Sequence, residues 1–170
     1  MKETKYILTM LVANEPGVTA RVTGLFAGRG YNIESICGAP THDPEVSRIT
    51  IKTNATAIQL DQIMKQIRRL INVVKLRDMT CDEAVKREMA LICVEAKPEN
   101  RAEITRSVEI FRGRIVDAGP EFFIIEVTGS EEKINALIKL LKPMGIKKLA
   151  RSGILALYRE AELPDMNEQW

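Results

Sequence analysis

Residues 4–39 read TKYILTMLVANEPGVTARVTGLFAGRGYNIESICGA, and the predicted fold of the amino-terminal half follows from this stretch. Residues 4–13 predict a strand, because alternate positions place apolar side chains on one face: Tyr6, Leu8, Met10 and Val12. Residues 14–17, Asn-Glu-Pro-Gly, predict a turn. A helix follows, with one apolar face made by Val18, Val22, Leu25 and Phe26. Gly28 and Gly30 end that helix, and residues 32–39 predict a second strand.

The residues that follow continue the alternation of strand and helix patterns. Residues 46–53 predict a strand with Ile49 and Ile51 facing inward and with Arg48, Thr50 and Lys52 facing outward. Residues 56–71 predict a helix whose apolar stripe is Leu60, Ile63, Ile67, Leu70 and Ile71. Residues 73–79 predict a last strand, so the first half has the order β-α-β-β-α-β.

The second half repeats this order. The pattern predicts strands at 89–96, 113–118, 122–128, 146–151 and 154–158, and a helix at 99–111. Ser130 is placed to cap a further helix, which has an apolar face and ends at Gly145. We therefore expect an α+β protein made of two ferredoxin-like βαββαβ domains.

The expected organisation is a first domain at 1–79, a linker at 80–87, a second domain at 88–158 and a charged tail at 159–170. Thr80 and Glu83 have the spacing of a capping box, which predicts a short helical turn in the linker. Each domain is small enough to have a marginal core, and each leaves sheet edges open. We therefore expect the sheets to pair with other chains.

Composition excludes several classes of chemistry. The chain has one histidine and three cysteines in 170 residues, and it contains no CxxC pair, so a multi-histidine metal site and a zinc knuckle are both excluded. The net charge of +2 is small, whereas nucleic-acid-binding proteins usually have a strongly basic surface. The charge therefore argues against a nucleic-acid partner. No apolar run is long enough to span a membrane, and the sparse cysteines are typical of a cytoplasmic protein.

Two local arrangements could carry chemistry. Cys37 and His42 could form a nucleophilic dyad, or they could bind a metal together with Asp43, but Cys37 is better explained as a small apolar residue of its strand.

Asn14 to Gly17 join a strand to a helix whose first N–H groups and partial positive charge suit a carboxylate. Gly17 allows close approach to the backbone, and the Asn14 amide oxygen can accept from an ammonium group. The junction thus fits an α-amino acid, although an ordinary helix start has the same pattern.

The same residues carry a family resemblance. The run from Asn14 to Phe26 resembles the opening of an ACT domain, an amino-acid-sensing module with a ferredoxin-like fold. The longer run GLF…RGYNIESI, residues 24–36, resembles the small regulatory subunit of acetolactate synthase. Three segments of the second half match as well: REMAL at 87–91, EIFRGRIVD at 109–117 and ARSGI at 150–154. The resemblance extends over about residues 4–158.

The resemblance implies a chain that is not an enzyme and holds no cofactor or metal of its own. Its partner would be the large catalytic subunit, which holds thiamine diphosphate, a divalent metal such as Mg²⁺, and FAD, and which condenses pyruvate in branched-chain amino-acid synthesis. The resemblance also implies a homodimer of paired ACT domains, with valine or a related inhibitor bound between them. That site would comprise Asn14, Gly17 and Val18 of one chain and Asn32 and Ile33 of its partner.

Three residues beside the proposed site depart from the family pattern. Thr19, Ala20 and Cys37 stand where related sequences usually have leucine, serine and threonine. The identity of the effector therefore stays open. The alternative functions are a stand-alone ACT-type sensor that acts on another enzyme or on transcription, and a small enzyme.

Overall fold

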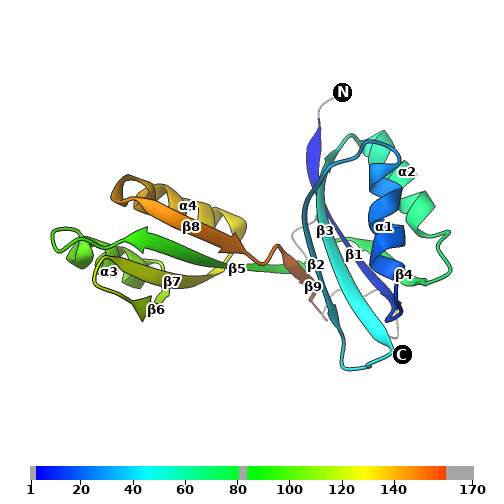
Figure 1. The fold of residues 1–170 in the computed structure, drawn as a ribbon. Coiled ribbons are helices and arrows are strands. Elements are labelled where there is room, and N and C mark those ends of the chain that lie inside the picture. Colours follow the sequence, from blue (N-terminus) through cyan, green and yellow to red (C-terminus); the bar gives the residue numbers. More distant parts are fainter. Residues whose placement is uncertain (1–2, 81–83, 160–170) are drawn as a thin grey trace. The chain divides into compact units, whose positions relative to one another are not determined.

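The computed structural model describes residues 3–80 and 84–159. Two compact units are present, and the chain passes from the first to the second and back again. The first unit contains the described residues up to Val85 and those from Ile154 onward, and the second contains Lys86–Gly153 (Figure 1).

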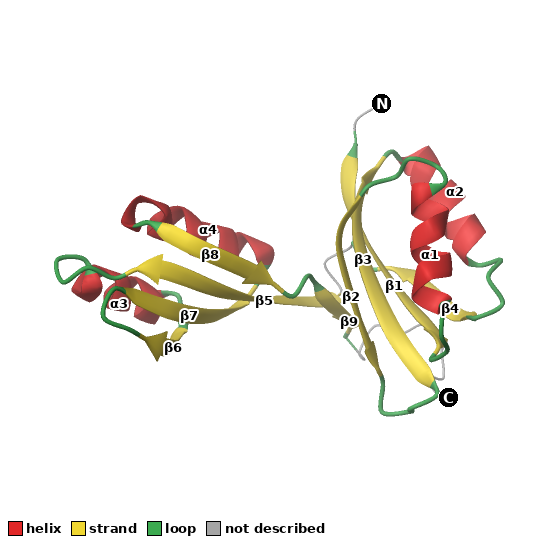
Figure 2. Cartoon of the chain, viewed as in Figure 1, coloured by secondary structure: helices red, strands yellow, loops and turns green. Residues whose placement is uncertain are grey.

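The first unit is a four-stranded antiparallel sheet with both of its helices on one face (Figures 1 and 2). Its elements, in chain order, are β1 (Thr4–Ala13), α1 (Val18–Ala27), β2 (Ile33–Pro40), β3 (Val46–Ala55), α2 (Ala57–Ile67) and β4 (Val73–Asp78). The strand order is β2-β3-β1-β4, so β2 and β4 form the edges of the sheet. The predicted βαββαβ arrangement is confirmed.

The core of this unit lies between the sheet and the helices. Leu8, Met10 and Val12 of β1 are buried on the helix side, as their alternation predicts. The apolar face of α1 packs against them through Val22 and Phe26, both of which are almost completely buried. A full capping box starts α2, because the Thr56 hydroxyl accepts from the Gln59 N–H and the Gln59 side chain accepts from the Thr56 N–H.

Two expectations about this unit are wrong. Thr50 and Lys52 do lie on the face opposite the helices, but they are buried rather than exposed to solvent. Thr50 shares a hydrogen bond of 3.1 Å with the Thr9 hydroxyl, and Lys52 Nζ lies 2.9 Å from the Glu34 carboxylate. Burial of these polar groups is tolerated because each is paired.

The second wrong expectation concerns the end of the second helix. Helix α2 ends at Ile67, where a turn begins in which the Leu70 N–H donates to the Ile67 carbonyl. Leu70 still packs against the core, whereas Ile71 is 95% exposed and does not belong to an apolar stripe. The helical periodicity therefore stops about one turn earlier than the sequence predicts.

The second unit repeats the architecture, with strand order β6-β7-β5-β8. Its elements are β5 (Ala84–Glu95), α3 (Arg101–Ile110), β6 (Arg114–Ala118), β7 (Phe122–Gly129), α4 (Glu131–Leu141), a 3-10 turn η1 (Lys142–Met144) and β8 (Ile146–Arg151). As predicted, the Ser130 side chain caps α4 by accepting from the Lys133 N–H. Arg151 makes two hydrogen bonds to the buried Glu88 carboxylate, at 2.7 and 2.6 Å. That hydrogen bonding raises the pKa of Arg151.

The segment between the two halves differs from the expected linker. Strand β5 begins at Ala84, so residues 84–87 are extended rather than helical. The Thr80 hydroxyl donates to the Asp78 carboxylate and accepts from the Ile7 N–H at 3.1 Å. Glu83, the other half of the predicted capping box, and Cys81 lie outside the described residues.

The last strand also differs from the expectation for the second domain. Strand β9 (Leu155–Tyr158) pairs with β5, and it belongs to the first unit. Ala156 is buried in a small cluster with Met79 and Ala84, and the Tyr158 hydroxyl donates to the Asp78 carbonyl at 2.8 Å. Of the predicted tail, residues 160–170 lie outside the described part of the chain.

A chain that ends at Gly153 lacks β9, and we expect it to be less stable. Met79 and Ala84 would lose their apolar neighbour Ala156, and the Asp78 carbonyl would lose a donor, which together cost about 1–3 kcal/mol. A chain that ends at Arg159 keeps β9 and is the matched control. Thermal unfolding of both compares their midpoints, and equal midpoints would show that β9 adds nothing.

Within residues 3–80 and 84–159, no helix is both long enough and apolar enough to cross a membrane.

Candidate functional site

The junction between β1 and α1 leaves backbone donors without side-chain caps. Gly17 is the residue before α1 and has φ +84°, a left-handed conformation that glycine adopts without strain. No side chain of the described residues caps this helix, and a Cβ built at Gly17 would meet nothing within 4 Å. The Val18 N–H donates to the Glu15 carbonyl at 3.4 Å, and the N–H groups that follow it in the first turn of α1 are open to a ligand that carries negative charge.

Asn14 is held in one orientation beside this helix start. Its Nδ2 donates to the Pro44 carbonyl at 2.8 Å, and its Oδ1 accepts from the Ser47 hydroxyl at 3.0 Å. Its backbone N–H donates to the Glu45 carbonyl at 2.7 Å. The amide oxygen has a second lone pair, so it can still accept from an ammonium group.

A second set of contacts ties the junction to Asn72, which directly precedes β4 (Val73–Asp78). The Asn72 amide donates to the Glu15 carboxylate at 2.8 Å, and Arg21 of α1 donates to the Asn72 amide oxygen at 2.7 Å. The Asn72 carbonyl also accepts from the Ala13 N–H at 2.9 Å. One asparagine thus connects the end of β1, the turn and the first helix.

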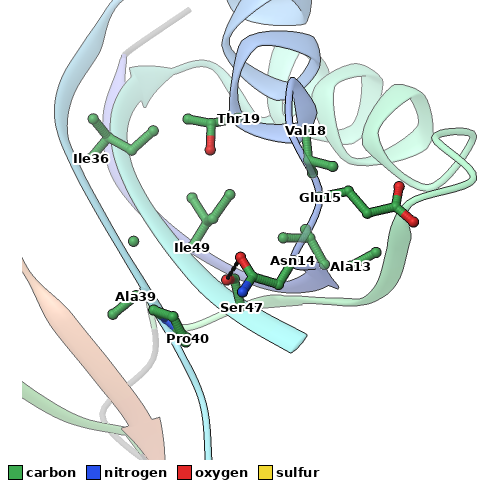
Figure 3. Close-up of a pocket in the computed structure, with 12 residues that line it drawn as sticks. Ala13, Asn14, Glu15, Val18, Thr19, Ile36, Ala39, Pro40, Ser47 and Ile49 are labelled. Carbon is green, nitrogen blue, oxygen red and sulfur yellow. Dashed lines mark hydrogen bonds between the residues drawn. The ribbon is translucent and has the colours of Figure 1, made fainter. Parts of the chain in front are cut away.

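A cavity of about 370 Å³ opens at this junction (Figure 3). It is lined by Val12, Ala13, Asn14, Glu15, Val18, Thr19, Ile36, Gly38, Ala39, Pro40, Ser47 and Ile49. Figure 3 shows the hydrogen-bonded Asn14 and Ser47 at one end, with Thr19 and Ile36 toward the other. The cavity combines polar groups with an apolar wall, which is the usual character of a small-ligand site.

The predicted site residues fall into two groups. Asn14 and Val18 line the cavity, and Gly17 lies between them in the chain. Ile33 is the first residue of β2 and Asn32 directly precedes it, and neither lines the cavity. The Asn32 carbonyl accepts from the Thr53 hydroxyl at 2.6 Å, and Ile33 packs against the core. Since these two were expected from a partner chain, their role stays a prediction.

Sequence reasoning missed Ser47, Ile36 and Ile49 as lining residues. Ser47 lies 33 positions from Asn14 in the sequence, and only the pairing of β1 with β3 brings the two together. Alternation along β2 could have placed Ile36 on the helix face, because it pairs with the buried Ile51. Ile36 is 38% exposed at the edge of the sheet.

The alternative chemistry at Cys37 finds no support in this geometry. Among residues 3–80 and 84–159, no group of three or more His, Cys, Asp or Glu side chains could hold a metal ion. Asp43 is used within its own turn, where its carboxylate accepts from the Glu45 N–H at 2.9 Å. Cys37 is a half-buried free thiol on β2.

Two family models match the chain and together cover most of it. Residues 8–75, which include the whole cavity, match the "AHAS small subunit-like ACT domain", and residues 87–160 match the "Small subunit of acetolactate synthase". The acetolactate synthase small subunit of Aquifex aeolicus is 48% identical over 163 residues, which is 95% of this chain and 84% of that protein. This chain belongs to the acetolactate synthase small-subunit family.

Other members of the small-subunit family agree in both sequence and structure. The probable acetolactate synthase small subunit of Archaeoglobus fulgidus is 46% identical, with 91% of this chain and 97% of that protein covered. The crystal structure of the small subunit from Thermotoga maritima superimposes with a TM-score of 0.84 at 41% identity, covering 92% of this chain and 98% of that one. The cavity therefore lies in the ACT domain of a small-subunit protein.

Proposed function

We propose that this chain is the non-catalytic regulatory subunit of acetolactate synthase. In this role it binds and activates the thiamine-diphosphate-dependent catalytic subunit, and it makes that subunit subject to feedback inhibition by valine or another branched-chain amino acid. The catalytic subunit supplies the thiamine diphosphate, Mg²⁺ and FAD. The observation that carries the proposal is the cavity at the uncapped start of α1, inside the matched ACT segment.

An α-amino acid is complementary to this cavity in charge and shape. Its carboxylate would meet the N–H groups at the start of α1, an interaction that contributes about 0.3–2 kcal/mol. Its ammonium group would donate to Asn14 Oδ1, at the polar end of the cavity. The aliphatic side chain would contact Val18, Ile36 and Ile49. Because one methylene is worth only about 1–3 kcal/mol, we expect valine, leucine and isoleucine to compete for the site.

The site is completed by a second copy of the chain in this proposal. Strand β2 is an edge of its sheet, and Ile36 presents an exposed apolar side chain there. Side-by-side pairing of two ACT domains at this edge would cover Ile36 and bring Asn32 and Ile33 of the partner to the cavity. Effector binding then favours one arrangement of the dimer, with a coupling to the catalytic subunit of about 1–3 kcal/mol.

Association with the catalytic subunit tests the proposed partnership. The purified chain is mixed with the acetolactate synthase catalytic subunit of the same organism, and the mixture is analysed by size-exclusion chromatography with light scattering. We expect a complex that contains both chains. If the two proteins elute separately at every ratio tried, a stand-alone sensor becomes the better explanation.

Replacing Ser47 by alanine is expected to weaken binding of the amino-acid effector, while the chain still activates the catalytic subunit. The substitution deletes the 3.0 Å hydrogen bond that orients Asn14 Oδ1, and a loss of this kind lowers affinity about threefold to tenfold. Calorimetric titration with valine measures the change. Ser35→Ala on the neighbouring β2 is the control, because Ser35 does not line the cavity. Unchanged affinity in Ser47→Ala would mean that Asn14 does not hold the ammonium group.

A further inference from the structure

A second cavity lies on the other face of the same sheet, away from α1 and α2. Alternation along β3 places Ile49 and Ile51 toward the helices, and therefore Arg48 and Thr50 toward the opposite face. There, β2, β3 and β9 enclose about 270 Å³, a little below the lower end of ordinary ligand sites at about 300 Å³. All of the lining residues belong to the first unit.

The walls of this cavity are mostly apolar. Strand β9 contributes Leu155, Ala156 and Leu157, and β2 contributes Ala39 and Pro40. Leu155 and Leu157 are each more than half exposed, so they are available to a ligand. This wall would bury a small branched hydrocarbon group, at about 25 cal/mol per Å² of apolar surface removed from water.

The hydroxyl groups of the lining are already occupied. Thr50 shares its 3.1 Å hydrogen bond with Thr9. The Thr41 hydroxyl donates to the Asp43 carbonyl at 3.1 Å and accepts from the Asp43 N–H at 3.2 Å. Neither hydroxyl is positioned as a free partner for a ligand.

Arg48 is therefore the polar group that decides what the cavity can hold. It is the charged side chain among the described residues that line the cavity, and within residues 3–80 and 84–159 its guanidinium has no hydrogen-bond or ion-pair partner. Lys75 and Arg77 line a neighbouring hollow of the same face together with Arg48, Leu11 and Met79. A guanidinium group with unused donors suits a carboxylate, whose two oxygens match its planar donor geometry.

We propose that this cavity binds a small branched aliphatic monocarboxylate that lacks an amino group. The carboxylate would accept hydrogen bonds from Arg48, and the hydrocarbon would lie against Leu155, Leu157 and Pro40. An amino acid is a poor fit, because its ammonium group would be repelled by Arg48 and would meet no acidic side chain in the lining. The two cavities share Ala39 and Pro40 but differ in their polar groups, because the proposed effector site has Asn14 as an acceptor for an ammonium group and this cavity has Arg48.

The thiol of Cys37 provides a direct readout, because it lines this cavity. The full-length chain is alkylated with iodoacetamide, and the rates at Cys37 and Cys93 are measured separately by peptide mass spectrometry. Three ligands of matched shape are compared: 4-methylpentanoate, 4-methylpentan-1-ol without the charge, and leucine with the added ammonium group. We expect 4-methylpentanoate to slow alkylation of Cys37 saturably and to leave Cys93, in the second unit, unaffected.

Arg48→Gln tests the charge, and Arg69→Gln, at an exposed position beyond α2, is its matched control. We expect Arg48→Gln to weaken protection by 4-methylpentanoate about tenfold and Arg69→Gln to leave it unchanged. Methyl NMR shifts of Leu155 and Leu157 provide a second measurement that does not need a reactive thiol. Absence of both protection and shifts would overturn the proposal. Equal protection by the alcohol or by leucine, or equal protection of Cys93, would also overturn it.

Discussion

Gly17→Asp is expected to abolish feedback inhibition while the chain still activates its catalytic partner. The new carboxylate would stand at the start of α1, where the carboxylate of the bound amino acid is proposed to sit, and two like charges at one site repel. The space around Gly17 is open, so the side chain does not clash with the fold. Aspartate also adopts left-handed φ more readily than most residues, so the backbone strain is small.

Inhibition is measured as the rate of acetolactate formation against valine concentration, and affinity is measured by calorimetry. Gly30→Asp is the matched control, since Gly30 also has a positive φ, at +68°, and also has nothing within 4 Å of a built Cβ. Gly30 follows the carboxyl end of α1, whereas Gly17 precedes its amino end, where the ligand carboxylate is proposed to bind. If Gly17→Asp binds valine as tightly as the unmodified chain, the cavity is not the effector site.

Phe26→Ala is expected to have the largest effect on stability. Phe26 is 1% exposed and lies where α1 packs on the first sheet. Truncating a large buried aromatic side chain leaves a cavity that neighbouring groups fill only in part, which costs about 3–5 kcal/mol. Native-state amide hydrogen exchange in β1 and β3 measures the unfolding free energy of the first unit without requiring that the two units unfold together.

Ile58→Ala is the control for this substitution. Ile58 lies on α2 in the same unit but is 54% exposed, so its truncation should change the unfolding free energy by no more than about 0.5 kcal/mol. A cost for Phe26→Ala as small as that for Ile58→Ala would mean that the α1–sheet contact is not a principal part of the core.

Local periodicity was sufficient to predict most of the fold. The strand at Thr4–Ala13 and the helix face of Val18, Val22 and Phe26 follow from patterns with periods of 2 and 3.6 residues, and the structure confirms them. The sequence prediction places residues 154–158 in the second domain, whereas β9 packs in the first compact unit against Met79 and Ala84, which are about 70 residues away in sequence. No local pattern contains that information.

The candidate site, too, could be predicted only where its residues are close in the sequence. Asn14 could be predicted because the turn and the helix start are contiguous in the sequence, and Val18 came from the family resemblance; both line the cavity. Ser47 could not, because its contact with Asn14 depends on the register of β1 and β3. The buried Thr50 and Lys52 were misjudged for a related reason: their partners, Thr9 and Glu34, come from other strands.

The initial rate of acetolactate formation by the catalytic subunit tests the central claim most directly. It is measured for that subunit alone, with this chain added, and with this chain and valine, leucine or isoleucine. The proposal predicts that the chain raises the rate and that at least one of these amino acids lowers it again only when the chain is present. A rate that does not change on addition of the chain would contradict the account.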